Sequence, residues 1–316
     1  MTTTDRSPLR VAVIGDIHGE VVASLPELRY AELTADTLCR VPIAMGAGGT
    51  AVNFACAAAE RFTEVHLIGR VGIDRTALIA TGGLDEAGVI CHLVQDPGRP
   101  TGLAVVLRDA DPARPKGTRL LLVQRDSANR GLTTAEVEAH RSLLMNVDAL
   151  VVDGYAMLAE PRRSACLHAM EIVATAGGVV VFDVVPHDSY RRYDLVELNR
   201  LCLDAAVLVA EVGTLCGFLG YEPHPDGFDR AQVEAVLPSL CEAFPGRALF
   251  LRFGIGNADE SLCVLPGRPP RYRRTGYVQT REPTGFGDRL TADELAEFLP
   301  VLSGRTSVSS REGEAG

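Results

Sequence analysis

The sequence predicts a single α/β domain built on a central, mostly parallel β-sheet. Short runs rich in Val, Leu and Ile recur along the 316 residues, and several are separated by Ala-rich or charged stretches with helical periodicity. There is no Trp and only 5% of residues are aromatic, so the core must consist mainly of aliphatic side chains, which suits buried parallel strands. Strands that alternate with helices favour right-handed βαβ units.

The expected elements follow the chain in order. Helical stretches are predicted at 53–62, 135–146, 161–176 and 230–244, between runs typical of buried strands at 9–15, 65–69, 104–109, 119–124, 148–154, 177–185, 205–210, 247–253 and 261–265. Segments 21–45 and 94–125 look like alternating strands without intervening helices, which predicts a small accessory sheet. We expect one domain over residues 9–303 and unstructured polar tails at 1–8 and 304–316.

Composition and charge exclude several function classes. The chain carries 41 acidic and 31 basic residues, a formal net charge of -10, which argues against a nucleic-acid partner. The apolar runs are too short to span a bilayer and the N-terminus lacks an apolar signal segment, so we expect a cytoplasmic protein without a membrane partner. The eight cysteines occur singly, mostly within apolar runs, and are predicted to be buried, reduced thiols.

Two local motifs suggest functions that the rest of the chain does not support. VIGDIHG (13–19) matches the opening motif of metallophosphoesterases, but GRVGIDR (69–75) and GNADE (256–260) lack the further acidic and His ligands that a two-metal centre requires. GAGGTAVNFA (46–55) resembles a dinucleotide-binding turn. That fingerprint needs a strand directly before its glycines, whereas the preceding segment is short and contains Pro42.

Two other glycine motifs lie near opposite ends of the chain. GGTAVN (48–53) opens an Ala-rich helical stretch, and the strand after it ends in GRVGID (69–74). TGFGD (284–288) precedes a second helical stretch, so its backbone N–H groups are expected at a helix N-terminus, where they can stabilise a transferring phosphoryl group. Asp288 then falls in the first helical turn, positioned to accept the proton of an attacking hydroxyl group.

Together these motifs resemble the two signatures of the ribokinase-like sugar kinases, also called the phosphofructokinase-B-type family. The resemblance is colinear from Val11 to about Leu299 and includes PTGLAVVLRD (100–109), SANRGLT (127–133), DALVVDGY (148–155) and VVVFDVVP (179–186). It implies a ribokinase-like fold in which helices flank the central sheet and a small β lid covers the sugar site.

The resemblance also implies an activity and its residues. The expected reaction is transfer of the γ-phosphoryl group of ATP, with Mg2+, to a hydroxyl group of a sugar, nucleoside or related polyol; a monovalent cation and a homodimer formed through the lid are further expectations. Asp288 is the implied catalytic base, with Gly285, Phe286 and Gly287 as the anion hole. The implied acceptor pocket contains Asp16, His18, Glu20, Gly48, Gly49 and Asn53.

This sequence departs from the family pattern around the nucleotide. In the segment that usually reads N-x-x-E, Glu211 replaces Asn and Thr214 replaces Glu, which leaves Glu211 as the candidate metal or cofactor residue. The usual T-x-G segment has Arg252 and Gly254, which we assign with Thr284 to nucleotide binding. Only 28 residues follow Asp288, whereas relatives usually continue for two or three helices that cover adenine. These departures favour an alternative, a kinase-fold protein that binds a ligand or regulates without phosphotransfer, whereas the retained G-F-G-D favours the enzyme.

Overall fold

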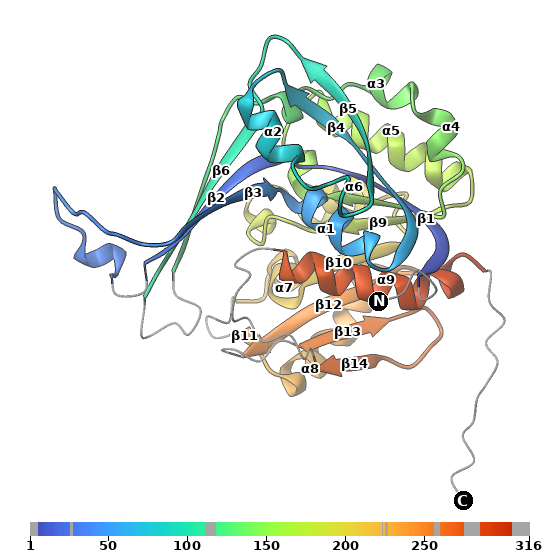
Figure 1. Ribbon diagram of the computed structural model, residues 1–316. Coiled ribbons are helices and arrows are strands. Elements are labelled where there is room, and N and C mark those ends of the chain that lie inside the picture. Colours follow the sequence, from blue (N-terminus) through green and yellow to red (C-terminus); the bar gives the residue numbers. More distant parts are fainter. Residues whose placement is uncertain are drawn as a thin grey trace, which may run out of the picture.

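The computed structural model (Figure 1) describes residues 6–25, 28–110, 118–222, 224, 227–255, 260–274 and 285–304. A large sheet runs through the molecule with helices on both of its faces, and a smaller sheet projects from one side. The predicted fold class, a central mostly parallel sheet flanked by helices with a separate small sheet, is confirmed.

The strands of the main sheet follow the order β14-β13-β12-β10-β9-β8-β1-β4-β5. From β12 to β5 neighbouring strands are parallel, and β13 and β14 add an antiparallel hairpin at one edge. The bounds are β1 Ser7–Ile14, β4 Phe62–Gly72, β5 Val89–Asp96, β8 Ala149–Asp153, β9 Val179–Asp183, β10 Val207–Glu211, β12 Ala248–Ile255, β13 Glu260–Val264 and β14 Arg271–Arg274, with β11 Gly227–Phe228 beside β12.

The chain reverses its direction across this sheet between β1 and β8. It first proceeds from β1 to β4 and β5, then returns to β8 on the other side of β1 and continues outward through β9, β10 and β12. In open α/β sheets, ligands bind outside the carboxyl ends of the strands at such a reversal. The carboxyl ends of β1 and β8 therefore mark the expected position of the functional site.

Helices cover both faces of the main sheet. On one face, α1 (Thr50–Ala59) and α9 (Phe286–Leu302) pack against each other. The opposite face carries α3 Thr134–Glu138, α4 Arg141–Leu144, α5 Arg162–Thr175, α6 Leu195–Leu201, α7 Val212–Phe218 and α8 Arg230–Ala243. Among the described residues, no helix combines the length and apolar character needed to cross a membrane.

The smaller sheet has the strand order β3-β2-β6-β7 within the described part of the chain. Its strands are β2 His18–Leu25, β3 Ile43–Gly48, β6 Gly102–Asp109 and β7 Arg119–Val123, and α2 (Arg75–Thr81) packs beside them. Successive strand residues point to opposite faces, so His18 and Glu20 lie on one face of β2 and Val21 and Ala23 on the other.

Three details differ from the sequence-based expectations. β1 begins at Ser7, so the segment expected as a tail already contains strand residues, and β5 at the start of the 94–125 segment belongs to the main sheet. The thiols of Cys39, Cys91 and Cys241 are exposed, so the prediction of buried cysteines is wrong for these three. Cys39 lies in a segment without regular structure, and Cys91 and Cys241 lie at exposed positions of β5 and α8.

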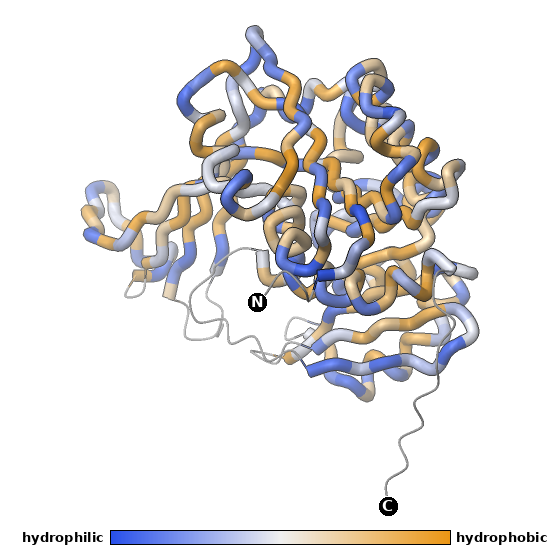
Figure 2. Tube along the Cα trace, turned by 45° about the vertical axis from the view of Figure 1, so that its right-hand side comes forward, coloured by the Kyte–Doolittle hydropathy of each residue, from blue (hydrophilic) through white to orange (hydrophobic). Residues whose placement is uncertain are grey.

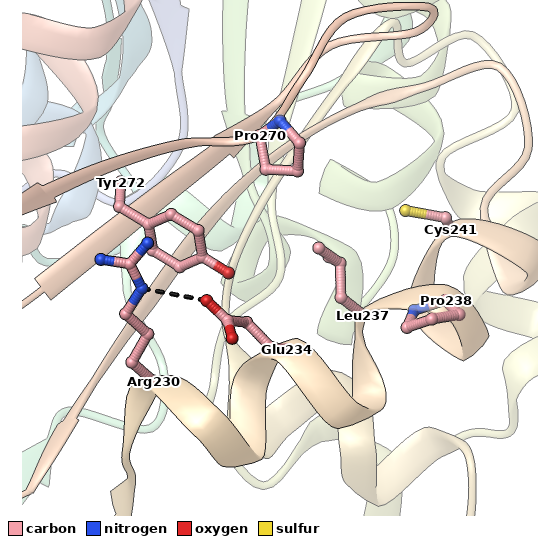
Figure 3. A pocket seen from close by; sticks show the side chains of 7 residues that line it. All are labelled: Arg230, Glu234, Leu237, Pro238, Cys241, Pro270 and Tyr272. Carbon is pink, nitrogen blue, oxygen red and sulfur yellow. Dashed lines mark hydrogen bonds and ion pairs between the residues drawn. The ribbon is translucent and has the colours of Figure 1, made fainter.

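A surface cleft lies between α8 and the edge strand β14 (Figure 3). Leu237 and Cys241 of α8 form one wall, and Pro270 and Tyr272 form the other. The guanidinium carbon of Arg230 lies 3.9 Å from the centroid of the Tyr272 ring, an arrangement that favours a cation–π contact. No residue that the sequence analysis assigned to a site lines this cleft.

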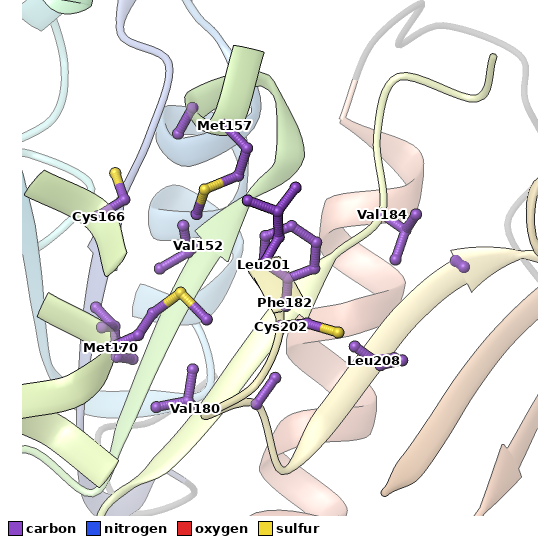
Figure 4. Close-up of a cluster of buried hydrophobic side chains, with 14 of the residues drawn as sticks. Val152, Met157, Cys166, Met170, Val180, Phe182, Val184, Leu201, Cys202 and Leu208 are labelled. Carbon is purple, nitrogen blue, oxygen red and sulfur yellow. The ribbon is translucent and has the colours of Figure 1, made fainter. Parts of the chain in front are cut away.

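The core consists of two aliphatic layers, one on each face of the main sheet. The layer beneath α5 and α8 includes Val152, Met170, Val180, Phe182 and Leu208, whose side chains interdigitate between β8, β9 and β10 (Figure 4). The other layer lies beneath α1 and α9. The hydropathy colouring of Figure 2 follows this arrangement, with hydrophobic segments through the interior. Burial of apolar side chains on both faces holds the strand ends in fixed positions.

Candidate active site

Four aspartates meet where the chain reverses across the sheet. Asp16 follows β1, Asp153 ends β8, Asp183 ends β9, and Asp288 lies in the first turn of α9. A small cavity beneath α9 is lined by Asp153, Asp183 and Asp288, together with apolar side chains of β1, α1 and β8. Elements that are far apart in the sequence therefore place several carboxylates around one point.

The Asp288 carboxyl group has a pKa near neutral pH. Desolvation is the largest cause that raises its pKa to about 7, and the nearby Asp183 and Asp153 charges add to the effect, while Arg252 opposes it. Burial likewise raises the pKa of Asp153 to about 7, with the Asp16 charge as the next cause. A carboxyl group whose pKa lies near the working pH is suited to general base catalysis.

The residues predicted to form the anion hole lie at the N-terminus of α9. Gly285 adopts a φ of 83°, a left-handed conformation that glycine reaches without steric cost, and it caps the helix that begins at Phe286. In an α-helix the first backbone N–H groups have no intrahelical acceptor, so those of the 285–288 segment are directed toward this end of the helix. The amides and the helix dipole together favour an anion at the position next to the Asp288 carboxylate.

Asn53 connects the two sequence motifs. A Cβ atom built on Gly285 would lie 3.3 Å from the side-chain carbonyl carbon of Asn53, and the Asn53 amide donates a hydrogen bond to Asp288. Gly49 caps the helix that carries Asn53, and its φ of 102° is a conformation that residues other than glycine rarely adopt. Asn53 therefore lies beside the first turn of α9 as well as near the predicted acceptor pocket.

Arg252, within β12, lies beneath the first turns of α9. Its guanidinium donates to Thr291 Oγ1 on α9, and Nη2 lies 3.9 Å from Asp183 Oδ2. A Cβ atom on Gly287 would come within 2.4 Å of Arg252 Nη1, so the glycine allows the guanidinium to approach the helix backbone. The side chain is largely buried, so its positive charge acts in a medium where screening is weak.

A buried ion pair fixes Asp16. The guanidinium of Arg162, at the start of α5, donates to Asp16 Oδ1 and also to the Tyr155 carbonyl at 2.7 Å. Asn129 Nδ2 donates to the same Asp16 oxygen at 2.9 Å, and the Asp16 backbone N–H donates to Asp153 Oδ2 at 3.0 Å. These contacts fix the orientation of the Asp16 side chain, and the positive charge of Arg162 balances its negative charge.

His18 and Glu20 extend the site along β2. Both side chains are 10% exposed, and His18 Nε2 lies 3.8 Å from Glu20 Oε2. A Cβ atom on Gly48 would collide with Glu20 Cβ at 2.6 Å, and one on Gly49 would meet His18 Nδ1 at 3.3 Å. The two glycines thus allow these polar side chains to lie against the backbone at the start of α1.

The residues assigned to the nucleotide are less tightly grouped. Glu211 is exposed at the N-terminus of α7, where its Oε1 lies 3.7 Å from His187 Nε2, and its charge is one of the causes that raise the pKa of Asp183 after desolvation. Gly254 follows Arg252 in β12 and pairs with Phe228. Thr284 lies outside the described residues. No group of three or more His, Cys, Asp or Glu side chains in the described ranges could hold a metal ion by itself.

Several residues of the site were not assigned from the sequence. The sequence gives no role to Asn129, Asp153 and Asp183, although they lie in segments that resemble the family, or to Arg162, which lies in the helix predicted at 161–176. The signal for Asp153 and Asp183 is an acidic residue directly after an apolar strand, in ALVVD and VVVFD. Arg162 carries no such signal, because its partner Asp16 lies 146 positions earlier in the chain.

Known proteins resemble the chain in both sequence and fold. Residues 10–219 match the model described as "pfkB family carbohydrate kinase". Fructokinase-1 of Oryza sativa subsp. japonica is 31% identical over 141 residues, which cover 43% of this chain and 41% of that protein. The 5-dehydro-2-deoxygluconokinase of Clostridium perfringens is 22% identical over 170 residues, which cover 54% of this chain and 48% of that protein. The chain thus matches about half the length of these relatives.

The fold similarity extends over nearly the whole chain. The structure of Arabidopsis thaliana ribokinase complexed with ribose and ATP superposes with a TM-score of 0.65 at 18% identity, covering 95% of this chain and 88% of that one. The family model covers about two thirds of the 316 residues and includes the ends of β1, β8 and β9. The chain belongs to the pfkB family of carbohydrate kinases.

Proposed function

We propose that this protein transfers the γ-phosphoryl group of ATP to a hydroxyl group of a sugar, nucleoside or related polyol. The observation that carries the proposal is the position of Asp288, a carboxyl group with a pKa of about 7 in the first turn of α9, hydrogen-bonded by Asn53. The pocket for the acceptor is formed by Asp16, His18, Glu20, Gly48, Gly49 and Asn53.

In the proposed reaction Asp288 accepts the proton of the attacking hydroxyl group. The first amides of α9, from Gly285 to Gly287, and the guanidinium of Arg252 stabilise the negative charge that develops on the phosphoryl oxygens. The acidic and amide side chains of the acceptor pocket orient the hydroxyl groups of the substrate.

The residues present fit ATP bound with Mg2+. Magnesium in such sites usually takes one or two carboxylates together with the phosphates of its substrate, which accords with the exposed Glu211 and with a protein that lacks a complete metal cage in its described part. When bound, Mg2+ neutralises the charge of the nucleotide phosphates. Glu211, Arg252, Gly254 and Thr284 are the proposed nucleotide residues, and a monovalent cation remains an additional proposal.

The test is phosphoryl transfer from Mg·ATP to a panel of sugars, nucleosides and polyols, with product detection by phosphorus NMR. A phosphorylated acceptor supports the kinase. If no acceptor reacts and ATP does not raise the melting temperature, while a polyol or nucleoside does, the kinase proposal fails in favour of a ligand-binding protein. A ligand at 100 times its dissociation constant stabilises a protein by about 2.7 kcal/mol, which a melting curve resolves.

The dependence of the reaction on pH is the first prediction. Because Asp288 acts as a base and its pKa is about 7, we expect kcat/KM to rise about tenfold per pH unit below pH 7 and to level off above it. The measurement is initial rates between pH 5.5 and 8.5 at constant free Mg2+. A rate that does not change across this range would exclude Asp288 as the titrating base.

We also propose a homodimer through the lid, meaning the small sheet β3-β2-β6-β7. Strand register aligns Met45, Val21, Val105 and Leu122 in one row, and Ile43, Ala23, Leu107 and Leu120 in the next. The rows share one face of the lid, and Ile43, Met45, Leu120 and Leu122 are 41–65% exposed. The lid projects from the rest of the molecule, so this apolar face is accessible to a second copy (Figures 1 and 2).

Leu122→Glu is predicted to convert the dimer into a monomer, because it places a charge in the centre of the proposed contact. Light scattering after size-exclusion chromatography measures the mass. Val196→Glu, which alters an exposed apolar residue on α6, is the control and should leave the dimer intact. A wild-type protein that is monomeric at every concentration would rule out the lid dimer.

A further inference from the structure

A buried carboxylate lies on α9 beyond the residues used in the proposed reaction. Glu294 is 1% exposed, and its polar neighbours on β13 are the side chains of Ser261 and Cys263. Desolvation raises the pKa of Glu294, whereas hydrogen bonding from Ser261 and, after it, the Arg252 charge lower it. A fully buried carboxylate is costly unless a nearby positive charge compensates for it.

The periodicity of α9 directs Glu294 toward Arg252. Gly287, Thr291 and Glu294 occupy positions i, i+4 and i+7, which share one face of a helix. Arg252 already contacts the first two of these residues, since its guanidinium lies against Gly287 and donates to Thr291 Oγ1. Glu294 is therefore the next side chain along the face that covers Arg252.

Strand register completes a buried polar patch beneath this face. Arg252 of β12 pairs directly with Ser261 of β13, so both side chains point to the same side of the sheet. Ser261 is fully buried, and its hydroxyl group favours the charged form of Glu294 by hydrogen bonding. Nε of Arg252 is buried without a hydrogen-bond partner in the described part of the chain. The patch thus contains a guanidinium N–H without a partner, and the positive charge of Arg252 acts on the Glu294 carboxylate.

We propose that Glu294 is a positioning residue, a counter-charge that holds the guanidinium of Arg252 beneath the anion hole. Asp183 attracts Arg252 from the side of the cavity, at 3.9 Å. Glu294 holds the guanidinium from the opposite side, along the helix. The consequence for catalysis rests on the proposed function, whereas the pairing of the two side chains does not.

A double-mutant cycle tests the pairing of Glu294 with Arg252 separately from its effect on catalysis. The variants are Arg252→Met, Glu294→Gln and the double mutant, each measured for melting temperature without nucleotide and for kcat with Mg·ATP. Glu297→Gln is the matched control, because Glu297 lies one turn further on α9 and pairs with Arg271 and Arg273 at the surface. The control should keep the melting temperature and kcat of the wild type.

Arg252→Met is expected to lower the melting temperature by at least about 5 °C, because it leaves the Glu294 and Asp183 carboxylates buried without their cation. Glu294→Gln should lower it less, because the guanidinium keeps Asp183 and Thr291 as partners. The double mutant should melt no lower than the worse single mutant. For kcat we expect a loss of about 100-fold in Arg252→Met and about tenfold in Glu294→Gln, with no further loss on combination. Glu294→Asp, which keeps the charge, should recover part of the loss.

Additive changes in melting temperature would overturn the pairing. Coupled melting temperatures together with an unchanged kcat in Glu294→Gln would overturn the positioning role and leave a structural pair. If the wild-type chain phosphorylates no acceptor, the proposed function fails, and the melting temperatures still decide whether Glu294 and Arg252 are partners.

Discussion

Asp288→Asn is expected to reduce phosphoryl transfer by about 10²–10⁴-fold, because the amide cannot accept the proton of the attacking hydroxyl group. The Asn side chain has nearly the same size, so the first turn of α9 and its amides should keep their positions. Binding of Mg·ATP should therefore change little while kcat collapses. The measurement is kcat and KM for both substrates, with circular dichroism to confirm the fold.

The same variant is expected to be more stable than the wild type at pH 8. The pKa of Asp288 is about 7 in the folded protein and near 3.9 in an unfolded chain, so the folded state holds the proton more tightly. The folded state therefore loses stability as the pH rises from about 4 to about 7, and the loss is complete above that range. Asn has no such titration.

The expected gain at pH 8 is about 2 kcal/mol, or roughly 4 °C in melting temperature, after allowance for partial exposure of the carboxylate to solvent. The gain should disappear near pH 4, where the wild-type carboxyl group is protonated in both states. Asp204→Asn, at an exposed position after α6, should show neither effect and serves as the control. A variant that keeps wild-type activity would contradict the role of Asp288 as the base.

The fold could be predicted from the sequence because its determinants are local. Apolar runs such as ALVVD and VVVFD contain no polar residue before their last position, which is typical of buried strands. The glycines before α1 and α9 indicate the turns at which those helices begin. The turn that carries the proposed base could be located for the same reason. Gly285, Gly287 and Asp288 are adjacent in the chain, so their arrangement follows from the conformation of a few residues.

The rest of the site depends on contacts between distant segments, which a single sequence does not display. Asp16 is held by Arg162 and Asn129, which lie 146 and 113 positions away. In the sequence, Arg252 is only a departure from the T-x-G segment of the family. Its contacts become clear when the structure places β13 and α9 beside β12. The energies of such ion pairs depend on the tertiary fold, because burial determines both the desolvation cost of a charge and the strength of its attraction to the opposite charge.

Arg162→Met should produce the largest loss of stability of any substitution considered for this protein. The guanidinium is 5% exposed and is the buried positive charge that faces both Asp16 and Asp153. Removing one partner of a buried ion pair typically costs about 3–5 kcal/mol, because the remaining charge is left uncompensated. Met fills a similar volume, so the loss reflects charge more than packing.

The loss should depend on pH in a defined direction. Burial and the Asp16 charge already raise the pKa of Asp153 to about 7, and Arg162 is the cation that opposes them. Without Arg162 this pKa rises further. A raised carboxyl pKa means that stability falls as the pH increases above the unfolded value near 3.9, so the variant should be far less stable than wild type at pH 8 and closer to it at pH 5.

Two further variants decide whether charge is the cause. Arg163→Met, at the neighbouring position on α5, removes a partly exposed guanidinium that donates to the Met157 carbonyl at 2.7 Å and lies 3.8 Å from Glu197. It should cost about 1 kcal/mol, far less than Arg162→Met. Asp16→Asn in the Arg162→Met background should restore part of the lost stability, because it removes one of the unpaired carboxylates. If that double mutant unfolds as easily as Arg162→Met, the arginine stabilises the site through packing of its stem, and the buried charge balance around Asp16 is not what holds these strand ends together.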